Sequence, residues 1–140
     1  MWVVDASVAV KWLVPEESRH EASTLITEAG PLLAPDLIIT EVSSALSRKA
    51  RLGQITAAEA KGAHSVWMEA LQCGVLTLSS SMDLLEESFQ LSLTLDHALP
   101  DCLYLALARR VSGVLVTADA RLAKKASEVE GLKVRLLGQA

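Results

Sequence analysis

Short apolar runs alternate along this chain with longer segments in which apolar residues recur every three or four positions. The runs lack the apolar–polar alternation of half-exposed strands, which is typical of strands covered on both faces. They occupy residues 2–4, 32–34, 75–78, 114–116 and 133–136. The run at 32–34 lies between Pro31 and Pro35, which favours an edge position. This alternation predicts an α/β fold, a three-layer α/β/α sandwich around a central parallel sheet.

The longer segments carry the sequence signals of helices. Ser18 with Glu21, and Thr56 with Glu59, each fit a capping box, in which a hydroxyl and a carboxylate bond the first backbone amides of a helix. Apolar residues follow the helical period at positions 63, 66, 67, 70 and 71, and again at 82, 85 and 89. Glycines, which are common at helix C-terminal caps, follow helical stretches at positions 30, 53, 74, 113 and 131.

Composition limits the class of protein. The chain has 140 residues and 51% hydrophobic content, enough for a single domain, predicted to span 1–140, with its own core. Every apolar run is far shorter than the roughly 18 residues of a membrane span, and the N-terminus lacks the basic start of a signal peptide. We therefore expect a cytoplasmic protein that does not enter a membrane. Cys73 and Cys102 have no metal-ligand spacing and are predicted to be reduced thiols in the core.

The charge balance is acidic. A net charge of −4 argues against a protein that coats nucleic acid. It does not exclude a nuclease, because metal ions can neutralise the acids and the bases can cluster elsewhere.

Three acidic residues stand where predicted strands end or helices begin. Asp5 directly follows the strand at 2–4, Asp119 follows the strand at 114–116, and Asp101 opens a helix predicted at 102–111. In parallel sheets ligands bind beyond the carboxyl ends of the strands, where these residues are expected. Aspartate is also a preferred helix N-cap, so each of the three, taken alone, is as easily a cap as a ligand. Asp36 is assigned to capping only.

Glu41 interrupts the apolar stripe of the helix predicted at 37–52, three residues after Ile38 and four before Ala45. A carboxylate on a core-facing stripe is rarely left unpaired, so we expect either a basic residue or a metal site to meet it. Converging carboxylates repel one another unless a cation lies between them. The four acids therefore form a candidate site for Mg²⁺ or Mn²⁺, which prefer carboxylate and water ligands, and not for zinc.

Other charged residues near these acids are weaker candidates. His97 lies four residues before Asp101 and either ligates a metal, acts as an acid or is structural. A lone loop histidine favours the structural interpretation. Asp96 is a further acid whose part in the site stays open. Arg121 follows Asp119 within one helical turn and is predicted to contact phosphate, although cations on helices also act as partners of the helix dipole.

Four short segments carry a family resemblance that extends over essentially the whole chain, with the segments in the right order and at the right spacing. They read Val-Val-Asp-Ala-Ser at 3–7, Ala-Pro-Asp-Leu-Ile-Ile-Thr-Glu-Val at 34–42 followed by Ala-Leu at 45–46, Asp-Cys-Leu-Tyr-Leu-Ala-Leu-Ala at 101–108, and Thr-Ala-Asp at 117–119. Together they closely resemble the PIN domain, and within that family the short VapC-type toxins of bacterial and archaeal toxin–antitoxin pairs. Each segment alone is a weak signal, whereas four in register are a strong one.

The resemblance implies an α/β/α sandwich with ribonuclease activity that depends on Mg²⁺ or Mn²⁺. It implies a small antitoxin that covers the active-site groove, and a homodimer. It carries the acidic quartet of the family, as catalytic residues and metal ligands, onto Asp5, Glu41, Asp101 and Asp119. Pro100 is a departure, because such toxins often have tyrosine there; we expect the following acid to keep its position, since proline fixes the backbone entering the helix.

The expected reaction is hydrolysis of RNA phosphodiester bonds. Asp5 and Asp101 are predicted as the primary metal ligands, while Asp119 completes that site or contributes to a second. Glu41 is predicted to hold a metal-bound water or to act as general base. The resemblance also matches family hydroxyls to Ser7 and Thr117, which are predicted to orient the carboxylates. Two alternatives stay open: a PIN-like module that binds RNA or protein without cutting, and a housekeeping nuclease outside any toxin–antitoxin pair. The RNA target, the number of metal ions and the antitoxin's identity also stay open.

Overall fold

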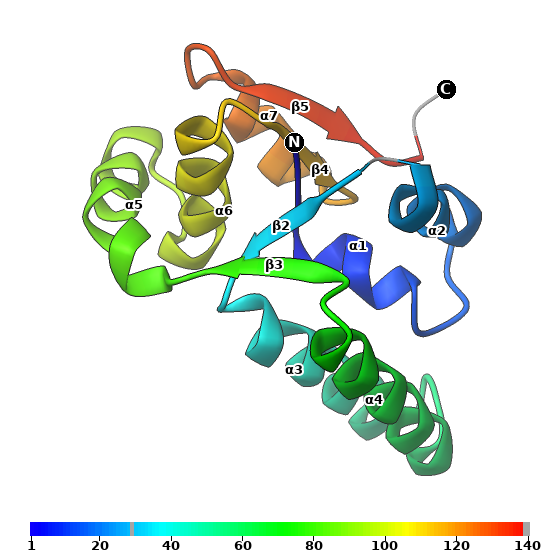
Figure 1. Ribbon diagram of the computed structural model, residues 1–140. Helices are drawn as coiled ribbons and strands as arrows, with labels where there is room; N and C mark the ends of the chain where they lie inside the picture. The colour runs from blue at the N-terminus through cyan, green and yellow to red at the C-terminus, as the bar shows by residue number, and fades with distance from the viewer. Residues whose placement is uncertain (29, 139–140) are drawn as a thin grey trace.

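The computed structural model describes residues 1–28 and 30–138, and its elements alternate between strands and helices (Figure 1). In chain order they are β1 (Trp2–Val4), α1 (Ala6–Lys11), α2 (Arg19–Glu28), β2 (Leu32–Pro35), α3 (Ile38–Arg51), α4 (Ala57–Gln72), β3 (Leu76–Ser79), α5 (Ser81–Leu95), α6 (Leu99–Arg110), β4 (Val114–Thr117), α7 (Ala120–Ser127) and β5 (Lys133–Leu136). The strands form one sheet in the order β3–β2–β1–β4–β5, and every neighbouring pair is parallel. This confirms the predicted parallel sheet.

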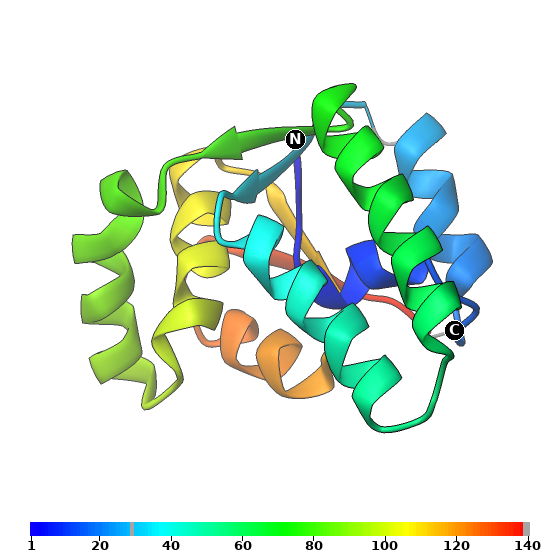
Figure 2. The same cartoon turned by 90° about the horizontal axis from the view of Figure 1, so that it is seen from below.

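Helices cover both faces of the sheet. The connections from β1 to β2 and from β2 to β3 place α1 to α4 on one side, and α5, α6 and α7 lie on the other (Figures 1 and 2). α6 packs against β1, β2 and β4, and α7 packs against β4 and β5. The architecture is the predicted three-layer α/β/α sandwich.

The strand order reverses between β1 and β4. The chain moves outward from β1 to β3 on one side and then crosses back to β4 on the other. In open α/β sheets such a reversal leaves a crevice at the carboxyl ends of the two strands, and ligands bind there. A ligand site is therefore expected at the carboxyl ends of β1 and β4.

The edge of the sheet differs from the sequence prediction. β2 is an interior strand whose four residues are all buried, so the edge position expected for 32–34 is wrong. Pro35 is tolerated because it is the last residue of β2, opposite Ser79, where at most one ladder bond is lost. The edge strands are β3 and β5, and both carry exposed residues. All five strands were expected to be covered on both faces, and this prediction is wrong for β3 and β5.

Of the two capping boxes predicted at helix starts, one forms and the other is replaced by contacts with distant residues. The capping box at α4 is confirmed, with Thr56 Oγ1 accepting from Glu59 N at 3.0 Å and Glu59 Oε1 accepting from Thr56 N at 2.9 Å. The box predicted at Ser18 is wrong, because Ser18 has a φ of 65° instead of extended backbone. Glu21 instead accepts from the Arg135 guanidinium and from Gly138 N, two partners that are distant in sequence.

Asp36 and Gly113 have structural roles that differ from the predicted ones. Asp36 Oδ1 accepts hydrogen bonds from the backbone N and the Oγ of Ser81, so it caps the start of α5 and not the helix that follows it in sequence. Gly113 lacks the positive φ of a C-terminal cap, and Ser112 adopts it instead with a φ of 52°. A Cβ on Gly113 would lie 2.6 Å from the Met1 carbonyl oxygen, so glycine is required there by close approach of the N-terminus.

Burial also departs from the sequence pattern on α5 and at one cysteine. The buried face of α5 carries Leu84, Ser88, Leu91 and Leu95, whereas the periodic residues at 82, 85 and 89 are exposed. Cys73 is exposed, so its assignment to the core is wrong, while Cys102 is buried as predicted. Within residues 1–28 and 30–138, no helix combines the length and the hydropathy that crossing a membrane requires.

Candidate active site

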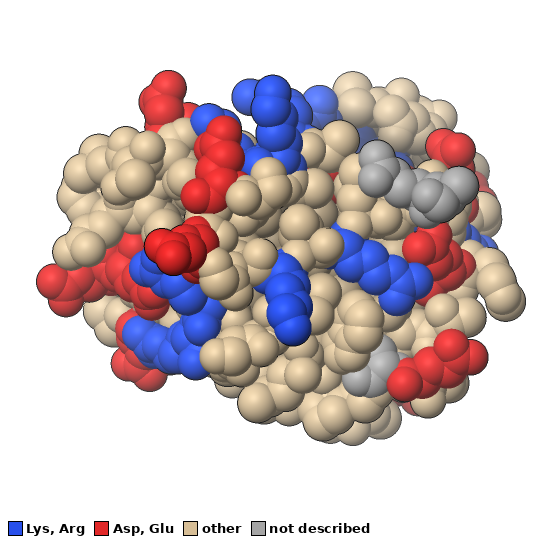
Figure 3. All heavy atoms as spheres, turned by 90° about the horizontal axis from the view of Figure 1, so that it is seen from above, with Lys and Arg blue, Asp and Glu red and all other residues tan. Residues whose placement is uncertain are grey.

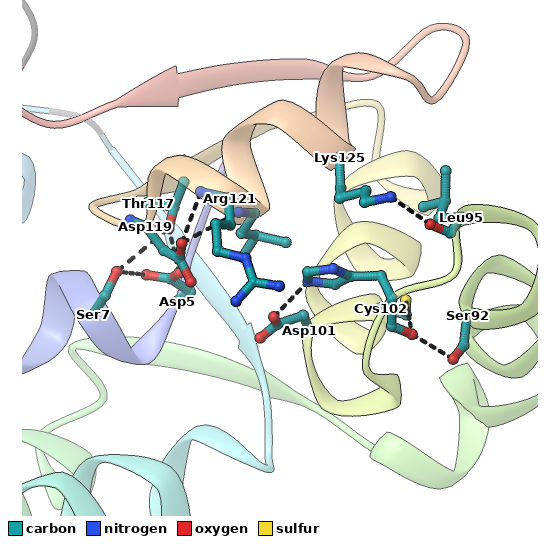
Figure 4. Close-up of polar contacts among 12 residues, drawn as sticks. Asp5, Ser7, Ser92, Leu95, Asp101, Cys102, Thr117, Asp119, Arg121 and Lys125 are labelled. Carbon is teal, nitrogen blue, oxygen red and sulfur yellow. Dashed lines mark hydrogen bonds and ion pairs between the residues drawn. The ribbon is translucent and has the colours of Figure 1, made fainter.

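The candidate site lies at the carboxyl ends of β1 and β4. Asp5 directly follows β1 and is the N-cap of α1, and Asp119 is the N-cap of α7 just beyond β4. The two strands are paired in register, with Val4 opposite Val116. The first and last segments of the sequence pattern therefore meet at the point where the strand order reverses, and Figure 4 shows their side chains together.

Asp5 is a buried carboxylate, only 5% exposed. Its Oδ1 accepts from Ser7 Oγ at 2.6 Å and from Val8 N at 3.2 Å, and its Oδ2 accepts from Thr117 Oγ1 at 2.5 Å. Burial raises the pKa of Asp5 to about 6; the hydrogen bonds oppose this shift, and the negative charge of Asp101 adds to it. A carboxylate in this position is stabilised by a proton or by a nearby cation.

Two hydroxyl groups hold Asp5 in place. Ser7 Oγ donates to Asp5 and accepts from Ala118 N at 2.9 Å. Thr117 Oγ1 donates to Asp5 and accepts from Asp119 N at 3.0 Å. Each hydroxyl thus joins the Asp5 carboxylate to the backbone that leaves β4. The two hydroxyl groups therefore fix the orientation of the Asp5 carboxylate.

Glu41 is hydrogen-bonded to a side chain that was not predicted as its partner. Its Oε1 accepts from the Tyr104 hydroxyl at 2.5 Å, whereas a basic residue or a metal site was expected. Tyr104 is the only tyrosine of the chain and lies three residues after Asp101, on the same side of α6, which is the signal that would have indicated it. Burial and the bond to Glu41 keep the pKa of Tyr104 well above its usual range, so this hydroxyl stays a donor.

Asp101 links these acids electrostatically. Burial raises the pKa of Glu41, the bond from Tyr104 lowers it, and the charge of Asp101 raises it again. The same charge raises the pKa of Asp5. Asp5, just after β1, and Glu41 on α3 therefore both lie within electrostatic range of Asp101 on α6.

Asp101 also contacts a histidine. It lies in the first turn of α6, inside the helix and not ahead of it, and its Oδ2 is 2.7 Å from His97 Nε2. The His97 side chain is only 9% exposed. The structure thus brings His97 to the acids, although a lone loop histidine suggested a separate structural role. Asp96 caps the end of α5 with a φ of 52°, and its exposed side chain makes no hydrogen bond within the described part of the chain.

Asp119 acts as a helix cap, one of the two interpretations that the sequence allows. Its Oδ1 accepts from Arg121 N at 2.9 Å and from Leu122 N at 3.3 Å. Its Oδ2 accepts no hydrogen bond from the described residues, so capping and ligation are compatible. The Arg121 side chain is exposed and extends from the start of α7 toward Asp101 (Figure 4).

These donors fit a hard divalent cation held in an open site. Over residues 1–28 and 30–138, no three His, Cys, Asp or Glu side chains approach closely enough to enclose an ion. Mg²⁺ does not require such a cage, because it keeps several waters and commonly binds through one or two carboxylates together with substrate phosphates. Carboxylates that lie close together are stabilised by a cation between them. The closed tetrahedral arrangement of a structural zinc site is not present among the described side chains.

Sequence comparison identifies the family. The family model of the PIN domain matches residues 2–128. The chain belongs to the PIN domain family. A curated relative, Ribonuclease VapC3 from Pyrobaculum aerophilum, is 33% identical over 123 residues, which are 88% of this chain and 92% of that protein. The family resemblance seen in the sequence is therefore confirmed.

Solved structures share the fold of this PIN domain. The crystal structure of PAE2754 from Pyrobaculum aerophilum matches with a TM-score of 0.68 and 25% identity, over 95% of this chain and 87% of that one. VapC20 from Mycobacterium tuberculosis, described as a sarcin–ricin loop cleaving toxin, matches with a TM-score of 0.67 and 17% identity, over 89% and 94%. VapBC2 from Rickettsia felis, bound to a DNA fragment from its promoter, matches with a TM-score of 0.65 and 10% identity, over 96% and 97%.

Proposed function

We propose that this PIN domain is a metal-dependent endoribonuclease that hydrolyses RNA phosphodiester bonds, and that it is the toxin of a VapBC-type pair. The observation that carries the proposal is the buried carboxylate of Asp5 at the reversal of strand order, with Asp101 close enough to raise its pKa. Such a pair of acids is costly to fold without a cation beside it. The relative that is 33% identical bears the name of a ribonuclease, which supports the same reaction for this chain.

The acids have distinct roles in this proposal. Asp5 and Asp101 are the primary ligands of Mg²⁺ or Mn²⁺, and Asp119 contributes the oxygen that its cap leaves free. When bound, the ion activates water and stabilises the negative charge that develops on the phosphate oxygens. Ser7 and Thr117 keep the Asp5 carboxylate in one orientation through their hydrogen bonds.

Glu41 is the proposed general base. The Tyr104 hydroxyl occupies its Oε1, which leaves Oε2 to accept the proton of the attacking water. The raised pKa of Glu41 makes it a better match to neutral pH than an ordinary carboxylate. Arg121 is proposed to contact a backbone phosphate of the RNA from the start of α7. As water attacks phosphorus, the bond from phosphorus to the leaving oxygen breaks, and the leaving oxygen takes up a proton from solvent.

An RNA-cleavage assay tests this function. Wild-type protein, purified away from any antitoxin, is expected to cleave RNA with Mg²⁺ or Mn²⁺ and to lose the activity in EDTA. Asp5→Asn is expected to bind RNA without cleaving it. Asp83→Asn is the matched control, because Asp83 is an exposed acid on α5 outside the site, and it should cleave like wild type. RNA binding without cleavage by wild-type protein would instead support the binding-module alternative.

A small antitoxin is the proposed protein partner. The solved VapBC2 assembly has the same fold, which supports the idea that such a partner suits this architecture. A short gene directly upstream, whose product co-purifies with this chain and suppresses cleavage, would support the toxin assignment. Active protein without such a neighbour would indicate a housekeeping nuclease. The homodimer stays a prediction, which light scattering of the purified protein tests.

A further inference from the structure

A cavity of about 290 Å³ lies beside the acidic site, between α7 and the loop that joins α5 to α6. We call it the α7 pocket and define it by its lining residues, His97, Arg121, Lys124, Lys125 and Glu128. Its lining carries more positive than negative charge, in contrast to the acids next to it.

The positive charge of the α7 pocket is not neutralised by ion pairs. Arg121 and Lys124 are exposed, and neither forms a salt bridge with any residue in the described ranges. Lys125 Nζ donates to the Leu95 carbonyl oxygen at 2.7 Å, which fixes the side chain but leaves its charge in place. Unpaired cations in a cavity provide an attractive potential for an anion.

A second cavity, of about 330 Å³ between α1 and α3, provides a useful contrast. It borders the site through Ser7 and also contains two lysines, but one glutamate pairs with both of them and cancels half of their charge. Glu16 Oε2 lies 2.5 Å from Lys49 Nζ, and Glu16 Oε1 lies 3.6 Å from Lys11 Nζ. Of these two cavities, the α7 pocket is therefore the better anion site.

Two residues that line the α7 pocket also contact acids of the candidate site. His97 lines the pocket, and its Nε2 contacts Asp101 Oδ2. Arg121 lines it as well, and its backbone N bonds the Asp119 carboxylate. An anion in the pocket would therefore lie directly beside the carboxylates where the reaction is proposed to take place.

Local attraction matters because the protein as a whole is acidic. With a net charge of −4, the chain offers little general attraction to a polyanion. Figure 3 shows acidic and basic residues interspersed over the face seen from above, without a broad patch of one sign. Binding of RNA next to four acids therefore requires a concentrated source of positive charge close to them.

We propose that the α7 pocket binds a backbone phosphate of the RNA strand, next to the phosphate that is cleaved. This inference rests on the proposed ribonuclease function and names the residues that position its substrate. Lys124 and Arg121 supply the charge, and Lys125 supplies both charge and a fixed wall. The pocket thus acts as a positioning site on one side of the acids.

The test compares single lysine substitutions by fluorescence anisotropy with a short single-stranded RNA. All variants carry Asp5→Asn and are measured in EDTA, so that neither cleavage nor metal affects binding. Lys124→Gln is expected to weaken binding roughly three- to tenfold and to reduce the slope of log K against log salt by about 0.7, the value for one contact to a single strand. Lys133→Gln removes the same charge from the exposed start of β5, outside the pocket, and should have neither effect.

Two further measurements keep the test decisive. Arg121→Gln provides a second probe of the pocket, whereas Lys125 is left intact because its loss would remove the donor to the Leu95 carbonyl. In the cleaving protein, Lys124→Gln should raise KM with little change in kcat, as expected for a contact used in binding and not in the chemical step. Equal affinities and salt slopes for Lys124→Gln, Arg121→Gln and their parent would refute the proposal that the pocket binds an RNA phosphate.

The outcomes also separate this inference from the proposed function. Wild-type cleavage together with unchanged binding by the pocket variants would refute the pocket alone. RNA binding that depends on Lys124, without cleavage by wild-type protein, would refute the ribonuclease and retain the pocket. If the parent protein bound no RNA, the pocket would be refuted as an RNA-binding site.

Discussion

Asp5→Asn should stabilise the metal-free protein at neutral pH, although it removes a residue proposed as essential for cleavage. Asp5 is almost fully buried, and the substitution replaces a charged side chain with a neutral one of the same shape. The amide oxygen of asparagine can still accept from Val8 N and Ser7 Oγ, so the cap on α1 is retained. The amide nitrogen faces Thr117, whose hydroxyl can accept in place of donating.

The magnitude follows from the pKa of Asp5. Folding raises it from 3.8 to about 6, which at 1.36 kcal/mol per pKa unit corresponds to about 3 kcal/mol. Because the folded protein holds the proton more tightly, this contribution to the free energy of unfolding is fully present below about pH 4 and is lost as pH rises to about 6. In the Asn variant this loss does not occur. The stability of the variant relative to wild type should therefore rise by up to about 3 kcal/mol between pH 4 and pH 7.

Urea unfolding in EDTA, followed by circular dichroism at several pH values, measures this difference. Comparing the two proteins at each pH removes the contribution of all other titrating groups. Asp83→Asn, on the exposed face of α5, should follow wild type throughout. Mg²⁺ should stabilise wild type by about 2.7 kcal/mol at one hundred times its dissociation constant, and the Asn variant far less. A variant that is less stable than wild type at pH 7 in EDTA, or equally stabilised by Mg²⁺, would refute the reasoning.

Two further substitutions test separate parts of the structure. Tyr104→Phe removes the donor that stabilises ionised Glu41, so the pKa of Glu41 should rise and the acid limb of the pH–rate profile should move to higher pH. Glu41 is partly exposed, so about 1 kcal/mol is at stake, or up to roughly fivefold slower RNA cleavage on the acid limb of the profile with near-normal cleavage on the alkaline plateau; an equal loss at every pH would contradict this. Gly113→Ala should lower the free energy of unfolding by about 1–3 kcal/mol, because its Cβ would lie 2.6 Å from the Met1 carbonyl oxygen. Both variants are compared with wild type by thermal melts. Gly62→Ala on α4, whose added Cβ would have no atom within 4 Å, is the control and should be neutral or stabilising. A neutral Gly113→Ala would rule out the close contact.

The sequence pattern predicted the bounds of the strands better than their positions in the sheet. The runs at 2–4 and 133–136 are strands with the predicted bounds, because strand formation there follows from local apolar character. The position of a strand within the sheet depends instead on long-range pairing. Local prolines therefore suggested an edge for β2, while its neighbours on both sides make it an interior strand.

Side-chain partners show the same division. Thr56 and Glu59 form the predicted capping box because both partners lie within one helical turn. Glu21 carries the same local signal, but Arg135 and Gly138 compete for its carboxylate from the far end of the chain. Such partners cannot be identified from hydrophobic periodicity, because only the folded chain brings them together.

The candidate site was predictable as a set of acids but not as a hydrogen-bond network. Asp5 and Asp119 were placed at the correct end of the sheet because strand ends can be recognised in the sequence. The bond from Tyr104 to Glu41 joins α6 to α3, and the bond from Thr117 to Asp5 joins β4 to β1. Both depend on how separate elements pack, which the sequence does not specify residue by residue.

The most direct test of the whole account follows metal binding and RNA cleavage in the same samples. Mn²⁺ is titrated into metal-free wild-type protein, the bound ion is counted by electron paramagnetic resonance, and single-turnover cleavage of RNA is measured at each point. We expect the cleavage rate to rise with bound Mn²⁺ and to return to background when EDTA removes it. Cleavage that persists without bound metal, or saturating Mn²⁺ that produces no cleavage, would contradict it.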